Sequence, residues 1–209
     1  MIRLLLTRHG ETEWNANGRM QGRADSPLTD LGYKQAQELA RKLNDESIDV
    51  IISSPSKRAI QTAELIKGQR DAVIHRDEHF LEMDVGEWEG QTKDEIEALD
   101  LERHQLFWEQ PHLFKTDQGE DFYHVRERVL PRLKHLIRDF TDQNILIVTH
   151  SVVLKILLSY FEQRPLEKLW EGPYIHGTSL SVVDIDEEET NIALYADTSH
   201  FSDPISAKD

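Results

Sequence analysis

The sequence contains no cysteine among its 209 residues. Disulfide scaffolds, thiolate zinc sites and thiol nucleophiles are therefore excluded. It also lacks any apolar run close to the roughly 20 residues that a membrane-spanning helix requires. The first ten residues, MIRLLLTRHG, hold too short an apolar stretch for a secretory signal. We therefore expect a cytoplasmic protein with no membrane as partner.

Positive charge is scarce as well, because 24 Lys and Arg residues stand against 39 Asp and Glu, a net charge of −15. Such a surface repels nucleic acid and anionic membranes, so neither is expected as a partner. A site for a phosphate would have to supply its own positive charge, so Arg residues beside motifs are informative. The GxxxxGK[ST] loop of nucleotide-hydrolysing P-loop proteins is also missing.

Strands and helices alternate along the chain. Apolar runs predict strands at residues 2–7, 49–53, 73–76 and 144–149, and a late pair at 180–184 and 192–196 around an acidic turn at 186–189. Amphipathic spacing predicts helices at residues 29–43, 56–66, 122–140 and 152–161, and an irregular helical stretch at 91–118. The pattern indicates a three-layer α/β/α fold, with a mostly parallel central sheet flanked by helices and an antiparallel edge.

The chain shows no repeat, low-complexity tract or long linker, and its hydrophobic content of 38% is ordinary for a globular protein. We therefore expect residues 1–209 to form a single domain.

Polar residues follow four of the predicted strands. Arg8 and His9 follow the first strand, Arg58 the second, Glu82 the third and His150 the fourth. The carboxyl ends of parallel strands meet at one edge of a sheet, where ligands bind. Arg matches phosphate oxygens with a planar fork, and His can act as nucleophile or acid–base group. The spacing alone fits both a phosphate site and a set of unrelated structural residues, and both interpretations remain open.

A metal site is the main competing chemistry, since ten histidines could include ligands. The two Arg residues beside the candidate ligands would repel a cation. We therefore expect neither a metal nor another cofactor.

Residues 6–15 (LTRHGETEWN) closely resemble the RHGET-x-x-N signature of the histidine phosphatase (phosphoglycerate mutase-like) superfamily. The likeness continues in family order through residues 27–32 (PLTDLG), 53–55 (SSP), 58–63 (RAIQTA), 81–90 (LEMDVGEWEG) and 148–150 (VTH). The chain looks similar to the short bacterial broad-specificity phosphatases of this superfamily. It departs from the pattern at Ser151, where many members have Gly.

The resemblance implies a metal-independent phosphomonoester hydrolase that acts on small phosphorylated metabolites through a phosphohistidine. It assigns the nucleophile to His9 and the general acid to Glu82. It assigns the binding of the phosphoryl oxygens to Arg8, Asn15, Arg58 and His150.

Two alternatives stay open: a phosphoglycerate mutase dependent on 2,3-bisphosphoglycerate, and a phosphate-binding module without turnover. The resemblance makes residues 91–120 a helical lid insertion, and within 95–119 the only Lys or Arg residues are Arg103 and Lys115. A lid with so few basic residues favours hydrolysis, because a mutase must retain a bisphosphorylated intermediate. Aromatic residues in and near the lid, namely Trp88, Phe107, Trp108 and Phe114, are expected either to line an apolar rim or to belong to the core. The substrate and the oligomeric state are not predicted.

Overall fold

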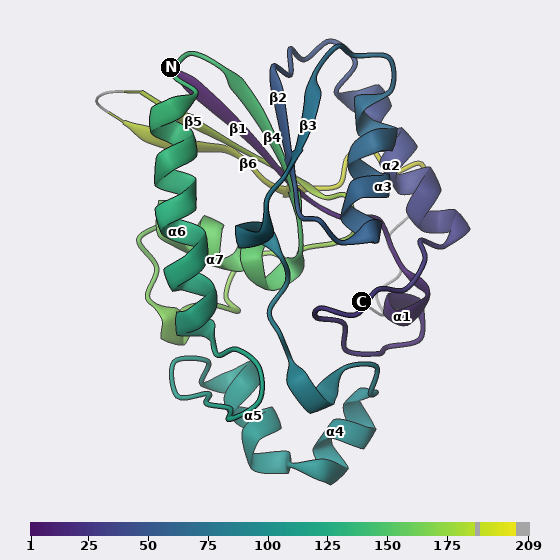
Figure 1. Ribbon diagram of the computed structural model, residues 1–209, viewed down its shortest axis with the longest axis vertical. Helices are drawn as coiled ribbons and strands as arrows, with labels where there is room; N and C mark the ends of the chain where they lie inside the picture. The colour runs from purple at the N-terminus through teal and green to yellow at the C-terminus, as the bar shows by residue number, and fades with distance from the viewer. Residues whose placement is uncertain (187–188, 204–209) are drawn as a thin grey trace.

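The computed structural model describes residues 1–186 and 189–203. Six strands form one sheet in the order β3-β2-β4-β1-β5-β6 (Figure 1). Their bounds are Ile2–Arg8 (β1), Val50–Ser53 (β2), Val73–Arg76 (β3), Asn144–Thr149 (β4), Leu180–Ile185 (β5) and Thr190–Asp197 (β6). Strands β3, β2, β4 and β1 are parallel, whereas β5 pairs antiparallel with β1 and β6 antiparallel with β5. The predicted mostly parallel sheet with an antiparallel edge is confirmed.

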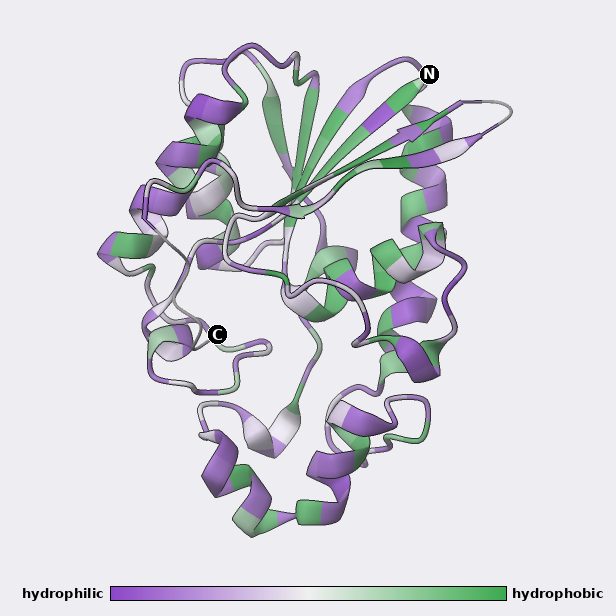
Figure 2. Ribbon diagram, turned by 180° about the vertical axis from the view of Figure 1, so that it is seen from behind, coloured by the Kyte–Doolittle hydropathy of each residue, from purple (hydrophilic) through white to green (hydrophobic). Residues whose placement is uncertain are grey.

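Helices cover both faces of the sheet. On β1, Leu4 and Leu6 pack in the cluster that contains the apolar residues of α6 (Phe122–Asp139) and α7 (Ser151–Phe161). The intervening Leu5 packs with α2 (Asp30–Lys42) and α3 (Lys57–Lys67). Successive side chains of a strand point to opposite faces, so a continuous apolar run supplies both cores. Figure 2 shows the largely hydrophobic sheet between helices whose other faces are hydrophilic. The three-layer prediction is confirmed.

Two short helices, α4 (Lys93–Leu99) and α5 (Leu101–Glu109), occupy the stretch for which irregular helix was predicted. Figure 1 places them beyond the carboxyl ends of the parallel strands. Helix α6 continues through Pro131 to Asp139. The predicted acidic turn at 186–189 includes residues 187–188, which lie outside the described residues. No helix among residues 1–186 and 189–203 is long and apolar enough to cross a membrane.

Several short elements were not predicted. They are the one-turn helix α1 (Glu13–Ala16) and the 3₁₀ turns Glu78–Phe80, Gly86–Trp88 and Leu166–Lys168. Each has three or four residues, too few for a periodic pattern to be visible in the sequence.

Two glycines let the end of β1 lie directly against the start of α2. A Cβ atom on Gly10 would lie 2.5 Å from the carbonyl oxygen of Gly32, and one on Gly32 would lie 2.1 Å from that of Glu11. Both contacts are with backbone, which cannot rotate away as a side chain would. This close approach fixes the backbone that follows His9.

We predict that Gly32→Ala destabilises the fold by about 1–3 kcal/mol, the usual effect of overpacking, because the methyl group would overlap Glu11. The measurement is urea unfolding of the purified protein. Gln37→Ala, an exposed substitution in the same helix, is the control and should change stability by less than about 0.5 kcal/mol. Equal effects of the two substitutions would contradict the prediction.

Candidate active site

The carboxyl ends of β1 and β4 and the start of α3 bring His9, His150 and Arg58 into contact. The Nε atom of Arg58 lies 3.2 Å from Nε2 of His9, and its Nη2 lies 3.2 Å from Nδ1 of His150. The two imidazole rings stand edge to face with centroids 5.1 Å apart. All three side chains are buried. The structure therefore joins residues that are 141 positions apart in the sequence (150 − 9) into one cluster.

The hydrogen bonds of His9 define which nitrogen is free to react. Its Nδ1 donates to the carbonyl oxygen of Gly10 at 2.8 Å, since a carbonyl can only accept. Its Nε2 accepts from Arg58, because guanidinium nitrogens only donate. Burial lowers the pKa of His9 well below 6.5, and the charges of Arg58 and Arg8 lower it further. His9 is therefore a neutral imidazole with its lone pair on Nε2.

His150 is held in the opposite tautomer. Its Nδ1 accepts from Arg58, so Nε2 carries the hydrogen and donates to the hydroxyl of Ser54 at 2.8 Å. Burial, followed by the charge of Arg58, lowers the pKa of His150 well below 6.5. The second histidine thus has an N–H group already formed.

Arg58 is fully buried, and each of its five N–H groups has an acceptor. Besides the two histidines it donates to the carbonyls of Gly22 and Ala24, at 2.7 and 2.8 Å, and to the carboxylate of Asp25 at 2.8 Å. Burial lowers the pKa of Arg58, and Asp25 opposes that effect. Asp25 also accepts from the backbone N–H of Lys57 at the first turn of α3.

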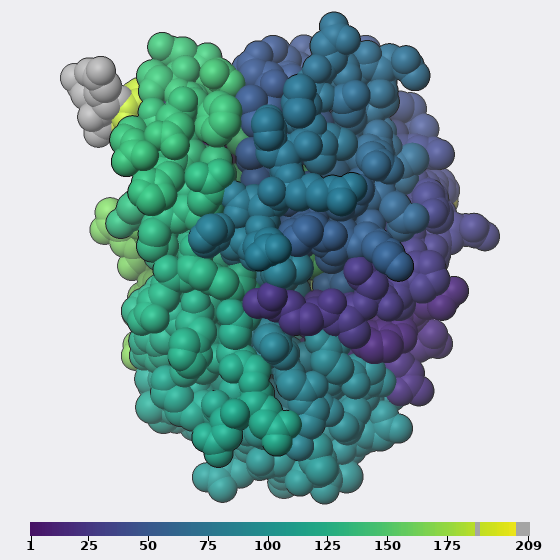
Figure 3. All heavy atoms as spheres, viewed as in Figure 1, coloured from purple at the N-terminus to yellow at the C-terminus, as the bar shows by residue number. Residues whose placement is uncertain are grey.

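The loop that holds Arg58 is itself held by a carboxylate. Glu89 accepts hydrogen bonds from the backbone N–H groups of Gly22, Arg23 and Ala24. Successive N–H groups of this kind form a concave anion-binding nest, which Glu89 occupies. In Figure 3 the purple N-terminal segment lies between the teal atoms of the α4–α5 region and the blue atoms above it. Asp25 and Glu89 were not predicted from the sequence as site residues. A buried Arg needs a counter-charge, and this requirement could have pointed to a nearby acidic residue such as Asp25.

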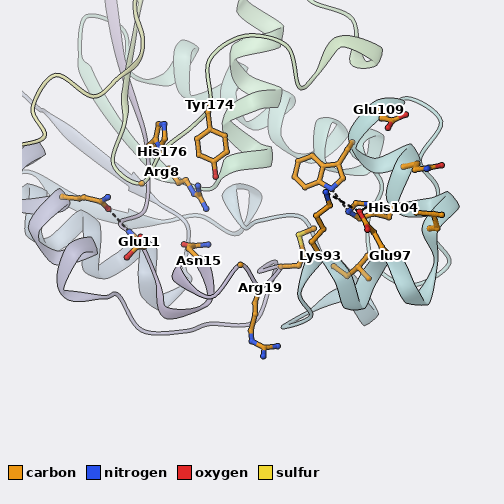
Figure 4. Close-up of a pocket in the computed structure, with 18 residues that line it drawn as sticks. Arg8, Glu11, Asn15, Arg19, Lys93, Glu97, His104, Glu109, Tyr174 and His176 are labelled. Carbon is orange, nitrogen blue, oxygen red and sulfur yellow. Dashed lines mark hydrogen bonds and ion pairs between the residues drawn. The ribbon is translucent and has the colours of Figure 1, made fainter. Parts of the chain in front are cut away.

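Arg8 and Asn15 present polar groups to a cleft beside this cluster (Figure 4). Arg8 donates through Nη1 to the carbonyl of Ile175, and its buried Nε has no hydrogen-bond partner among the described residues. The Oδ1 atom of Asn15 accepts from the N–H and hydroxyl of Thr12, so its amide nitrogen is left for the cleft. Both side chains can donate to an incoming anion.

Glu82 follows β3 and lies on the wall of the same cleft, nearly buried at 5% exposure. Its Oε1 accepts from the backbone N–H of Met83 at 2.9 Å. Its Oε2 accepts from the hydroxyl of Ser151 and the backbone N–H of Val152, both at 3.2 Å. The carboxyl group is therefore fixed at three points, two of them at the start of α7.

The cleft consists of two adjoining cavities of about 610 and 400 Å³, a size that suits small ligands. Both are lined by Arg8, Asn15, Arg19, Met20, Trp108 and Tyr174. Of the four aromatic residues for which rim and core were open, Trp108 lines the cleft, whereas Phe107 belongs to the buried core and also borders the smaller cavity. Trp88 and Phe114 are buried in the core and do not line the cleft.

Basic residues of the α4–α5 region have acidic partners. Arg103 pairs with Glu87 and Asp100, and Lys115 pairs with Asp121. Lys93, at the start of α4, lines the larger cavity and pairs with Glu97 at 3.4 Å. This side of the cleft thus carries little uncompensated positive charge.

Metal-binding geometry is not evident within the described part of the chain, where no three His, Cys, Asp or Glu side chains are grouped to hold an ion. His75 and His79 have the HxxxH spacing that zinc sites use on a helix. They stand on β3 and in a 3₁₀ turn, and the Nδ1 atom of His79 pairs with Asp77.

We predict that the fold loses stability as the pH falls from 7 to 5.5, in part through His9. Folded His9 stays neutral in this range, whereas the unfolded chain takes up a proton below about pH 6.5, so acid favours unfolding. His9→Asn should reduce the loss of unfolding free energy by up to about 1.4 kcal/mol per pH unit. Urea unfolding across this pH range measures both slopes, and identical slopes would contradict the prediction.

Comparison with known proteins places this geometry in a family. The family profile of the histidine phosphatase superfamily (branch 1) matches residues 4–198. Phosphoserine phosphatase 1 of Hydrogenobacter thermophilus is 32% identical over 203 residues, covering 97% of this chain and 96% of that protein. The adenosylcobalamin/alpha-ribazole phosphatase of Escherichia coli is 33% identical over 190 residues, covering 90% and 92%.

Among solved structures, Bacillus stearothermophilus YhfR superposes with a TM-score of 0.93 at 41% identity, covering 96% of this chain and 99% of that one. Profile, sequence relatives and fold agree over nearly the whole chain. The chain is therefore a phosphatase that belongs to the histidine phosphatase superfamily.

Proposed function

We propose that the protein hydrolyses small phosphomonoesters through a phosphohistidine formed on Nε2 of His9, without a metal or other cofactor. The observation that carries the proposal is the hydrogen bond from Nδ1 of His9 to the carbonyl of Gly10. It orients the ring and leaves the lone pair on Nε2, and burial keeps the ring neutral. A positioned neutral imidazole is a competent nucleophile at neutral pH.

In the first step, the Nε2 lone pair attacks phosphorus and the ester P–O bond breaks. The Nε–H group of Arg58 now donates to Nε2, so a phosphoryl oxygen must replace Nε2 as its acceptor for this attack. The unpartnered Nε of Arg8 and the amide of Asn15 supply further donors. Phosphoryl transfer is catalysed mainly by such positioning and charge stabilisation.

Glu82 handles the proton in both steps. As the ester bond breaks, its carboxyl group gives a proton to the alcohol oxygen. The resulting carboxylate then accepts a proton from water, whose oxygen attacks phosphorus as the P–N bond breaks. Phosphate leaves, and neutral His9 and protonated Glu82 are regenerated. The position of Glu82 on the cleft wall beside Arg8 supports this role.

The wall of the smaller cavity supports small esters of largely apolar alcohols as substrates. Met20, Phe107, Trp108, Trp170 and Tyr174 line the smaller cavity. With Arg103 and Lys115 paired elsewhere, the region offers little to hold a second phosphate, so hydrolysis is favoured over mutase activity. The relatives named for phosphoserine and alpha-ribazole show that similar chains accept different alcohols.

We propose that helices α4 and α5, within residues 91–120, act as the lid over this cleft in a single 1–209 domain.

The principal test is hydrolysis of p-nitrophenyl phosphate in the presence of EDTA. We expect release of nitrophenol by the wild-type protein, a phosphate-labelled, acid-labile adduct on quenching, and loss of both in His9→Ala. Sensitivity to EDTA would overturn the metal-free mechanism. Absence of release from both proteins would favour the alternative, a binding module without turnover.

A second assay distinguishes the proposed phosphatase from a phosphoglycerate mutase. With 3-phosphoglycerate and catalytic 2,3-bisphosphoglycerate, the proposed phosphatase should yield phosphate, whereas a mutase would yield 2-phosphoglycerate. A panel of phosphorylated metabolites, ranked by kcat/KM, should place esters of apolar alcohols above bisphosphorylated acids. The opposite ranking would contradict the assignment of the apolar wall.

We further predict that Arg58→Ala lowers kcat by on the order of 10²–10³, the usual effect of removing one oriented transition-state donor. Arg58→Lys keeps the charge and much of the volume, but it cannot donate to both histidines and should also lose most activity. Circular dichroism and thermal unfolding should accompany the kinetics, because Arg58 is fully buried. A loss below threefold in folded protein would refute the role of Arg58.

A further inference from the structure

Ser151 makes a contact that the proposed mechanism has not used. It is the first residue of α7, and its hydroxyl lies 3.2 Å from Oε2 of Glu82. The side chain lines the smaller cavity together with Glu82 and Val152. A glycine at this position could not make this contact, so the interaction depends on the Ser151 side chain.

The partners of the Glu82 carboxyl group differ in what they can do. The backbone N–H groups of Met83 and Val152 can only donate. The hydroxyl of Ser151 can donate or accept, depending on its rotation. Among the described residues that contact this carboxyl group by hydrogen bonds, Ser151 alone can reverse its direction.

We propose that Ser151 is a positioning residue that holds Glu82 in both of its protonation states. The inference rests on the proposed role of Glu82 as acid and then base. Before the ester binds, the O–H group on Oε2 donates to the Ser151 hydroxyl, which holds the neutral acid in place; with the ester bound, this O–H group turns to the alcohol oxygen. Once the proton has passed from Oε2 to the alcohol oxygen, the Ser151 hydroxyl turns and donates to the new carboxylate.

The effect of the Ser151 hydroxyl on kcat/KM should depend on the leaving group of the ester. Departure of nitrophenolate needs little proton donation, whereas departure of benzyl alcohol needs a proton from Glu82. The two esters, p-nitrophenyl phosphate and benzyl phosphate, are similar in size and both aromatic. Their ratio of kcat/KM thus reports proton donation with little influence from binding.

We expect Ser151→Ala to lower kcat/KM for benzyl phosphate about tenfold, the effect of one hydrogen bond to an ionisable group, and for p-nitrophenyl phosphate less than about threefold. Ser151→Thr keeps the hydroxyl and should restore most of the benzyl phosphate activity. Ser159→Ala removes a hydroxyl from the same helix, where it donates to the carbonyl of Ile156, and should leave the ratio unchanged.

Equal losses of Ser151→Ala on both esters, or no loss, would overturn the proposal. Glu82→Gln distinguishes this failure from that of the mechanism. If Glu82→Gln selectively impairs benzyl phosphate and Ser151→Ala does not, the role of Ser151 alone is wrong. If Glu82→Gln shows no selectivity, Glu82 is not the acid, and the proposed function fails together with this inference.

Discussion

The buried guanidinium of Arg58 is the interaction on which the arrangement of the site depends. A buried charge is costly unless it is paired and every polar hydrogen is satisfied. Arg58 meets this requirement with acceptors from the residues that follow β1 and β4 and from residues 22–25. Because the fork is planar and rigid, these acceptors have fixed relative positions. The two histidines, the start of α3 and the loop are therefore placed together, as one unit.

Much of the fold could be predicted because its central elements carry strong local signals. The apolar runs of β1 and β4 and the capping residue Thr29 of α2 mark these elements. The order β3-β2-β4-β1 could not be predicted, since it depends on pairing between segments far apart in the chain. Pattern alone also gave no indication of α1, which is stabilised by reciprocal hydrogen bonds between Thr12 and Asn15 rather than by an apolar face.

The site was partly predictable for a related reason. Residues that end parallel strands meet at one edge, which accounts for His9 and His150. Asp25 lies in a loop and pairs directly with Arg58, and Glu89 holds the backbone of the same loop. No strand or helix period points to either residue. The aromatic residues divided between cleft and core because both environments favour the same residue types. Only the path of the chain between Trp88 and Phe114 decides which side chains face the substrate.

The loop of residues 22–25 has a consequence for how such enzymes can diversify. Glu89 precedes α4 and Glu120 follows α5, and both fasten to this loop, Glu89 through backbone N–H groups and Glu120 through Arg23. The segment between Glu89 and Glu120 is thus attached to this loop at both of its ends. Substitutions on the cleft side of its helices leave the hydrogen-bond partners of Arg58 in place, because none of those partners lies between Glu89 and Glu120. In the proposed function, the residues of this segment that contact the alcohol can therefore vary while the residues that bind the phosphoryl group stay unchanged.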